Sequence, residues 1–474
     1  MGLTNRESKT NEPIDRFHDD HEAVTHTLFA ALALLGVVLS ACRLPDPPTV
    51  QPGGRLAYIG GDGNVYVTTA DRRVTAAVTD DATAPPEGPG LSYHRLAWSP
   101  DGRLAFAVVT RSGNKAHSTL YVVDAVGEPA RPVGQSDDHF VIYIAWSPVA
   151  CPGRPACRRL AYLIEERDGV GLHLVELEGD RLENRLVGVG RPFYFSWAPD
   201  GRRILWHTGG ARRHRPEARI ALYDVERDHV ETLPQAPGLF LAPAWSPQGH
   251  HWLSVEANEA LDQLQLFGDD QPRTVAAAQD AEMSFAWSPD GSRVAYAVRA
   301  RSDDPFYGPI HLFDLATGES LQVTDGAFQI LAFFWAPDGR RIAYLTRLAL
   351  PDAAWMQWRV YDVAGQRDRG YTAFQPSSQM RFVIHSFNQY AQSDHFWSPD
   401  GRYLVYADRD RALVERVWLV DTWAEKGSDP ILVGEGSIGF WSWAGSHEQA
   451  FASTAAFTRG RSIPEPRTKL SAWR

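Results

Sequence analysis

The pentapeptide Trp287-Ser288-Pro289-Asp290-Gly291 decides the fold, because its pattern recurs along most of the chain. Trp followed by Ser or Ala and then Pro occurs seven times. A degenerate eighth copy begins at Trp443. The eight markers are Trp98, Trp146, Trp197, Trp245, Trp287, Trp335, Trp397 and Trp443. Their spacing runs from 42 residues (287 minus 245) to 62 residues (397 minus 335). Self-similarity at such a period is typical of propellers and solenoids.

The residues after each marker have the chemistry of a tight turn. Ser can cap a type I turn, Pro fixes φ at its second position, and Gly suits its fourth. Five copies keep both Asp and Gly, at Asp101 and Gly102, Asp200 and Gly201, Asp290 and Gly291, Asp338 and Gly339, and Asp400 and Gly401. We expect structural roles for these residues and for the Trp markers, which would pack between neighbouring repeats, rather than catalytic ones.

Each repeat reads as four short strands. Phe285-Ala286-Trp287 ends a first apolar strand, and Arg293-Val294-Ala295-Tyr296 begins an alternating second one. A third strand ends in an acid, as at Asp314, and a weaker fourth follows. Four antiparallel strands in about 48 residues make a propeller blade. A single blade cannot bury both of its faces, so the blades must stack on one another.

The two ends of the repeat region complement each other. Residues 55–78 read as the second to fourth strands of a blade, and residues 438–443 supply a first strand. We therefore predict an all-β chain with one β-propeller over residues 55–446, closed by the C-terminal strand joining the N-terminal blade. Eight blades are expected, with seven as the alternative if the last motif is an outlying hairpin. Residues 447–474 are expected to be a C-terminal tail.

The repeat is similar to a known family. Trp-[Ser/Ala]-Pro-Asp-Gly, a following Arg-x-Ile-Ala-Tyr and a later Tyr-x-x-Asp resemble the TolB-type, WD40-like repeat, also called PD40, over most of residues 55–443. The resemblance implies the fold but leaves the function open, because related repeats occur in periplasmic TolB, in prolyl-oligopeptidase-like peptidases and in oligogalacturonate lyases. About 12 residues separate Cys42 from the propeller, too few for the N-terminal α/β domain of TolB. We therefore do not carry over a Tol–Pal role.

The N-terminal segment resembles an export signal. Residues 28–41 are uncharged and mostly apolar, a length that suits a signal-peptide core. They lead into Leu39-Ser40-Ala41-Cys42, which resembles a bacterial lipobox, although residues 1–27 hold three basic and six acidic groups instead of a positive start. We predict a signal peptide over residues 1–41, a lipid on Cys42 and a Pro-rich tether over residues 42–54. The protein would be a membrane-anchored, extracytoplasmic lipoprotein of the periplasm or outer surface.

Charge and cysteine content exclude several classes. The net charge of −11 argues against a nucleic-acid partner. Three cysteines are too few for a disulfide-dense scaffold or a multi-cysteine zinc protein. After Cys42, the remaining pair is Cys151 and Cys157, which we expect to form a disulfide in an exported protein. Two free thiols are the alternative.

A binding module is the favoured function. Loops between the second and third strands, and those entering the first strand, would share one face, which includes the long insertion at residues 371–392. The candidate binding residues on this face are Arg212, Arg213, Arg215, Arg299, Arg301, Tyr307, Arg347 and Trp355. They would suit a protein, anionic or glycan partner. The alternative is a set of solvated loop tips balanced by nearby Asp residues.

An enzyme is the second hypothesis. A lyase would need metal ligands in or near the central channel, and His139 and His395 are the most suggestive of 16 scattered histidines. They stand seven and two residues before their markers, which places them at different heights, so we expect ordinary loop histidines. A peptidase would need a Gly-x-Ser-x-Gly motif, and the segment at residues 435–439 fails at its first position. We expect no enzymatic activity and no cofactor.

Overall fold

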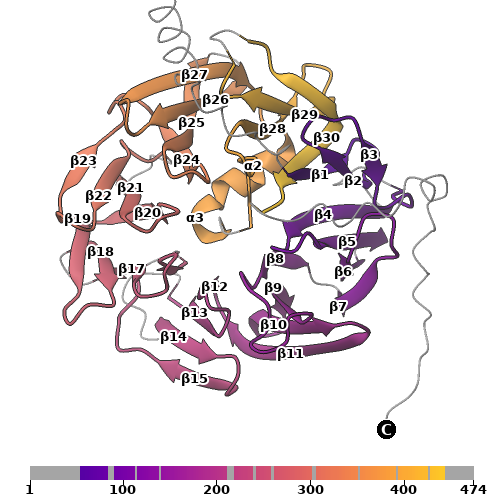
Figure 1. Cartoon of the computed structure of the whole chain (residues 1–474), viewed down its shortest axis with the longest axis horizontal. Coiled ribbons are helices and arrows are strands. Elements are labelled where there is room, and N and C mark those ends of the chain that lie inside the picture. Colours follow the sequence, from indigo (N-terminus) through magenta and orange to yellow (C-terminus); the bar gives the residue numbers. More distant parts are fainter. Residues whose placement is uncertain are drawn as a thin grey trace, which may run out of the picture. The chain divides into compact units, whose positions relative to one another are not determined.

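A computed structural model of the chain places antiparallel sheets in a ring around a central axis (Figure 1). The described residues are 54–83, 90–112, 115–137, 140–210, 218–238, 242–257, 261–300, 306–350, 353–390, 393–424 and 428–443. The predicted signal peptide, Cys42, the tether up to residue 53 and the tail at 447–474 lie outside them. No helix in these ranges is long and apolar enough to cross a membrane.

Six sheets contain four strands each, and each follows one sequence repeat. The first holds β4 (Gly90–Trp98), β5 (Leu104–Ser112), β6 (Lys115–Val123) and β7 (Arg131–Asp137). The second holds β8 (Val141–Trp146), β9 (Arg158–Glu166), β10 (Gly169–Glu178) and β11 (Arg181–Gly190). The third holds β12 (Phe193–Trp197), β13 (Arg203–Thr208), β14 (Arg219–Asp224) and β15 (His229–Thr232).

The next three sheets repeat the plan. They are β16 (Ala244–Trp245), β17 (Trp252–Ala257), β18 (Asp262–Phe267) and β19 (Arg273–Ala278); then β20 (Ala281–Trp287), β21 (Arg293–Ala300), β22 (His311–Asp314) and β23 (Ser320–Gln322); then β24 (Ile330–Trp335), β25 (Arg341–Leu350), β26 (Ala353–Asp362) and β27 (Arg367–Phe374). In each sheet, the strand that ends at the Trp marker is the innermost (Figure 1).

The seventh sheet closes the ring and has six strands. Its order is β28 (Tyr403–Arg409), β29 (Glu415–Asp421), β30 (Ile431–Trp441), β1 (Arg55–Gly60), β2 (Val65–Thr69) and β3 (Thr75–Ala77). The first half of β30 pairs with β29, and its second half pairs with β1. The predicted closure by the C-terminal strand is thus confirmed.

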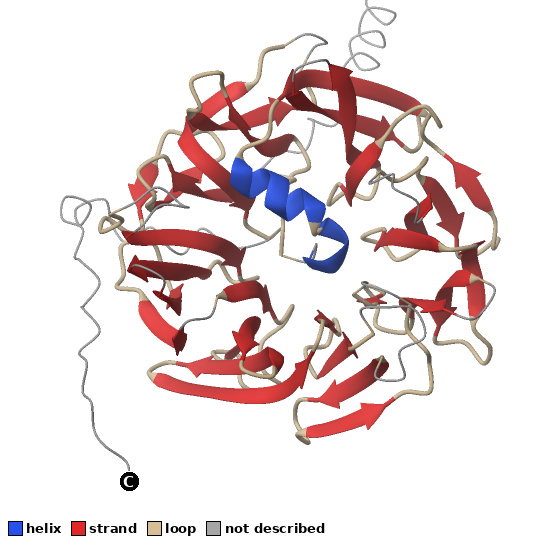
Figure 2. Cartoon of the chain, turned by 180° about the vertical axis from the view of Figure 1, so that it is seen from behind, coloured by secondary structure: helices blue, strands red, loops and turns tan. Residues whose placement is uncertain are grey.

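The ring contains seven hydrogen-bonded sheets among the described residues, which is the alternative count given above. The eight sequence repeats fit into them because β30 is the fourth strand of one repeat and the first strand of the next. Two repeats therefore share one continuous sheet. The all-β propeller architecture is confirmed, with one addition. The insertion before the seventh marker is helical, forming α2 (Ser378–His385) and α3 (Phe387–Tyr390), as Figure 2 shows at the centre of the ring.

The Trp markers connect neighbouring repeats through their indole N–H groups. In six repeats the indole Nε1 donates to the backbone oxygen of the residue just before the preceding repeat's marker. The pairs are Trp98 to Phe440, Trp146 to Ala97, Trp197 to Ala145, Trp287 to Ala244, Trp335 to Ala286 and Trp397 to Phe334, at 3.0 to 3.2 Å. Trp245 Nε1 and Trp441 Nε1 are buried and have no hydrogen-bond partner among the described residues. These bonds place the markers in structural positions between blades.

This pattern corrects the position of the eighth marker. Trp98 bonds to Phe440, so the marker of the last repeat is the next residue, Trp441, and not Trp443. Ser442 supports this register, because its Oγ accepts from the N–H of Arg55 at 3.0 Å. Ser99 accepts in the same way from Arg103 at 2.8 Å within a complete motif. Trp443 instead donates to the Trp98 oxygen at 2.7 Å.

The Asp and Gly residues of the motif form the turns that the sequence predicts. In the turn after Trp287, Ser288 Oγ donates to Asp290 Oδ1 at 2.6 Å, and the same carboxylate accepts from the N–H of Ser292 at 3.1 Å. Gly291 has φ of +66°, where a side chain is strained. An added Cβ would also lie within 2.6 Å of the Gln248 side chain. The five complete motifs all have such a positive φ at Gly.

At the second marker a cysteine loop replaces this turn. Cys151 and Cys157 form a disulfide with 5.3 Å between their Cα atoms. Both side chains are buried, and the Cys151 N–H donates to the Cys157 oxygen at 3.2 Å. Ser147 still bonds to the strand after the loop, because its N–H donates to the Arg159 oxygen at 2.9 Å. The loop is therefore an insertion that leaves the pairing of β8 with β9 intact.

We expect the double variant Cys151→Ala/Cys157→Ala to fold but to lose about 2 kcal/mol of unfolding free energy, because the short loop constrains the unfolded chain only modestly. Urea unfolding with and without reductant measures the difference. Reductant should shift the parent's midpoint to that of the variant. A parent midpoint that does not respond to reductant would contradict the stabilising role of the disulfide.

Candidate functional site

The helical insertion lies beside the inner strands of several sheets (Figure 1). It enters between β27 and β28, so antiparallel geometry puts it on the same face as the loops between second and third strands. Ser377 caps α2, because its Oγ accepts from the Met380 N–H at 3.0 Å. Ser386 ends the helix, with its N–H bonded to the Val383 oxygen at 3.1 Å. We call the ring face that carries α2 the helix face.

One side of α2 is buried in the ring and the other faces solvent. Met380 is fully buried, and Val383 and Ile384 are buried beside it. Phe387 of α3 continues this apolar side, with its ring centroid 5.4 Å from that of Phe333. The solvent side presents three residues together, namely Arg381, Phe382 and His385. Phe382 is 51% exposed, which is unusual for so large an apolar side chain.

Polar contacts fix the insertion to three separate strands or loops. Ser377 Oγ donates to the Ser437 oxygen of β30 at 2.5 Å. The Ser378 N–H donates to Glu415 Oε1 of β29 at 2.9 Å. At the other end, Asn388 Nδ2 donates to the Tyr307 hydroxyl at 3.0 Å. The insertion is thus held at both ends by hydrogen bonds and not only by apolar packing.

The inner strands that meet the insertion carry β-bulges. In β4, β8, β24 and β30 one residue is left out of the pairing with the second strand, and these residues are Arg95, Ile142, Leu331 and Ser437. No such irregularity occurs in the pairing of β12 or β20 with its second strand. A bulge redirects a side chain at a sheet edge. Here it directs the bulged residues to the pockets or contacts beside α2.

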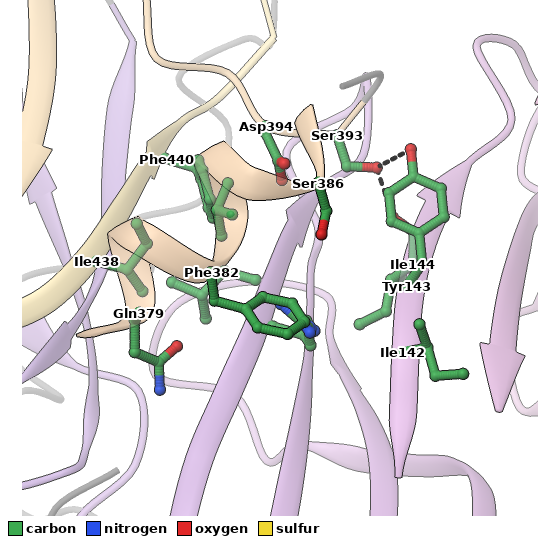
Figure 3. A pocket seen from close by; sticks show the side chains of 13 residues that line it. Ile142, Tyr143, Ile144, Gln379, Phe382, Ser386, Ser393, Asp394, Ile438 and Phe440 are labelled. Carbon is green, nitrogen blue, oxygen red and sulfur yellow. Dashed lines mark hydrogen bonds between the residues drawn. The ribbon is translucent and has the colours of Figure 1, made fainter. Parts of the chain in front are cut away.

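The first pocket, which we call the channel pocket, lies between α2 and the inner strands β4, β8 and β30 (Figure 3). Its cavity volume is about 30 Å³, enough for one or two water molecules. It is lined by Arg95, Leu96, Ile142, Tyr143, Ile144, Gln379, Phe382, Val383, Ser386, Ser393, Asp394, Ile438 and Phe440. Apolar walls thus surround a few polar groups.

Two polar residues of the channel pocket differ in their bonding. Ser393 Oγ donates to the Ile144 oxygen at 2.5 Å and lies 3.2 Å from the Tyr143 hydroxyl. Asp394 lies deep in the pocket but keeps partial contact with water. Burial raises the pKa of Asp394 to about 7, and the charge of Arg95 only partly opposes this. The Arg95 guanidinium stacks over the Phe382 ring at 4.5 Å.

The second pocket, which we call the helix pocket, lies on another side of the insertion. Its cavity volume is about 100 Å³. It is lined by Arg299, Tyr307, Leu331, Met356, Arg381, Ile384, His385 and Phe387. Arg299 forms an ion pair with Glu282, and its guanidinium stacks over the Tyr307 ring at 4.8 Å. Tyr307 is 4% exposed, so its ring is a wall rather than a free contact surface.

The structure brings together two of the eight predicted binding residues, Arg299 and Tyr307. Arg347 is exposed and stacks over the Phe306 ring at 5.3 Å, and Trp355 pairs with Leu348 across the β25–β26 hairpin. Neither lines either of these pockets. The remaining four, Arg212, Arg213, Arg215 and Arg301, lie outside the described residues.

Sequence reasoning missed Arg95, Arg381 and His385 as site residues. The length of the insertion was the available signal for the last two, and nothing in the sequence marks the bulge at Arg95. Sequence reasoning singles out His395 but not the neighbouring Asp394. The His395 Nδ1 lies 3.2 Å from the Trp441 oxygen. His139, its proposed companion, lies outside the described residues.

Metal-binding groups are sparse in the part of the chain that the structure describes. The one cluster of three close His, Cys, Asp or Glu side chains there consists of Cys151, Cys157 and Glu176. The two sulfur atoms of this cluster are joined in the disulfide, and a disulfide sulfur is not the thiolate that binds metals.

Comparison with known proteins places the chain by fold. No protein-family model matches it, and no curated protein matches it. Dipeptidyl peptidase 4 of Porphyromonas gingivalis aligns with 81% of this chain and 58% of its own, at 12% identity and a TM-score of 0.52. Oligogalacturonate lyase from Vibrio parahaemolyticus aligns at 13% identity, over 78% of this chain and 98% of its own, with a TM-score of 0.46.

TolB from Acinetobacter baumannii aligns with 70% of this chain and 81% of its own, at 14% identity and a TM-score of 0.37. The chain spans less than two thirds of the length of the peptidase. At these identities the likeness concerns the fold alone, because one fold hosts many functions. The chain is a β-propeller whose helix face carries a helical insertion flanked by two pockets.

Proposed function

We propose that the chain is an exported, lipid-anchored, TolB-like β-propeller that acts as a non-enzymatic binding module at the cell envelope. Its binding surface is the helix face, where it takes a protein or a smaller ligand. The observation that carries this proposal is the insertion itself. An insertion held at both ends presents Arg381, Phe382 and His385 to solvent beside two pockets.

Two physical features support binding at this place. Exposed aromatic and arginine side chains are enriched at interaction surfaces and dominate their energetics. The insertion is also preorganised, since Ser377, Ser378 and Asn388 fix it by hydrogen bonds to three other elements. A fixed surface has less conformational entropy to lose when it binds.

A photo-crosslinking residue at position 382, in the full chain in its native cells, is expected to trap a partner in a discrete adduct. The matched control carries the same residue at position 227. Arg227 is exposed in the turn between β14 and β15, on the opposite face of the ring. Adducts of equal yield and pattern at both positions, or none at position 382, would contradict a binding role for the helix face.

The same cells test the anchor. The parent is expected to incorporate a fatty-acid probe, and Cys42→Ala is expected to lose that label while the propeller still folds. Cys42 precedes the propeller in sequence, so its replacement leaves the Trp markers and the ring closure in place. Labelling that persists in Cys42→Ala would overturn the lipoprotein assignment without affecting the crosslinking result.

A further inference from the structure

We propose that the helix pocket binds a carboxylate carried on a short apolar body. Two sources supply this chemistry, a free branched organic acid or the C-terminal leucine of a partner peptide. The proposal rests on the binding role assigned to the helix face and specifies the chemistry that one part of it recognises.

The size and walls of the pocket select the apolar part of the ligand. A cavity of about 100 Å³ is smaller than the ~150 Å³ cavity that admits benzene, so it suits a group of roughly four to six heavy atoms. Its apolar lining comes from Leu331, Met356, Ile384 and Phe387. A branched aliphatic group gains from burial against such walls. A sugar would bury hydroxyl groups there without enough partners.

The charges around the pocket select the anionic part. Arg299 is compensated by its ion pair with Glu282. Arg381 is exposed and forms no ion pair with any described residue, so the positive charge at the rim is uncompensated there. His385 follows four residues later on α2, which places the two side chains on the same side of the helix. A carboxylate at the rim thus meets a guanidinium and an imidazole together.

The bulge in β24 makes this arrangement possible. The ladder between β24 and β25 skips Leu331, which leaves its side chain outside the regular alternation of the strand. The same residue lines the pocket opposite the insertion. Without the bulge, the inner strand would present a different side chain at this height.

The test titrates full-length protein with isovalerate and follows binding by ligand-observed NMR, with isovaleramide as the neutral isostere. Isovalerate is expected to bind with a dissociation constant on the order of millimolar, as its few atoms allow. The amide should bind at least tenfold more weakly. Arg381→Gln should weaken isovalerate binding about tenfold or more. Arg227→Gln, which removes an exposed arginine on the opposite face of the ring, should change it less than twofold.

A second variant keeps the proposal testable if Arg381→Gln fails to fold. Glu282→Gln removes the carboxylate that forms an ion pair with Arg299. The Arg299 guanidinium could then pair with the ligand carboxylate, so isovalerate binding should strengthen several-fold. A dipeptide with a free C-terminal leucine and its amidated form separate the two sources. Binding of the free form at least tenfold tighter than isovalerate assigns the pocket to a peptide terminus, and comparable binding assigns it to a free acid.

Equal binding of isovalerate and its amide, no saturable binding of either, or unchanged affinity in Arg381→Gln would each overturn the proposal. The crosslinking experiment at position 382 separates this failure from a broader one. A partner trapped there, with no carboxylate binding in the pocket, would leave the binding module standing and refute only the ligand chemistry.

Discussion

Trp441→Ala is expected to lower the unfolding free energy of the propeller by about 3–5 kcal/mol, the usual cost of truncating a buried Trp. Trp441 is fully buried where the chain ends meet, and its ring stacks near Tyr403 with centroids 6.3 Å apart. The adjacent Phe440 oxygen receives the Trp98 indole. Removing the Trp441 side chain therefore opens a cavity in the sheet that closes the ring.

Trp443→Ala is the matched comparison, because Trp443 is only partly buried. It should cost about 1–2 kcal/mol, the worth of one hydrogen bond and some buried area. Urea unfolding followed by circular dichroism measures both variants. Equal losses, or a larger loss for Trp443→Ala, would contradict the assignment of Trp441 as the marker of the last repeat.

The fold was predictable because its signals are local. The residues of Ser-Pro-Asp-Gly favour a turn by themselves, so each copy predicts a strand boundary from the local sequence alone. The last copy lacks this turn sequence, because the strand that follows it in the sheet begins at Arg55, near the N-terminal end of the propeller. Trp441 and Trp443 lie two residues apart and so point to the same side of an extended chain. Periodicity alone could not separate them.

The site was less predictable because it depends on contacts distant in sequence. Basic and aromatic residues in a loop pointed to Arg299 and Tyr307, and both line the helix pocket. The same reasoning could not foresee that Glu282 pairs with Arg299 or that Tyr307 is buried. Nor could it place Arg381 beside them, because the insertion reaches across the ring from another repeat. Composition identified the face, whereas bulges and packing determine which residues meet.

Asp394→Asn is expected to stabilise the protein increasingly as pH rises from about 3.8 to about 7, and by a constant amount above that. Burial raises the pKa of this carboxyl to about 7, well above its ordinary value of 3.8. The folded state therefore holds the proton more tightly than the unfolded state. The resulting stabilisation is complete below about pH 3.8 and is lost as pH rises through about 7. Above that, the parent carries a charged carboxylate that the pocket disfavours.

The gain has an upper bound of about 4 kcal/mol at pH 8, since one pKa unit corresponds to about 1.4 kcal/mol. The true value is smaller because Asp394 retains contact with water and Arg95 favours its charge. Urea midpoints measured from pH 5 to pH 8.5 for parent and Asp394→Asn test this, with exposed Asp270→Asn as the control. The difference between parent and variant should widen up to about pH 7 and stay constant above it. A constant difference would mean that Asp394 does not titrate in this range, and that its pocket solvates the charge as well as bulk water does.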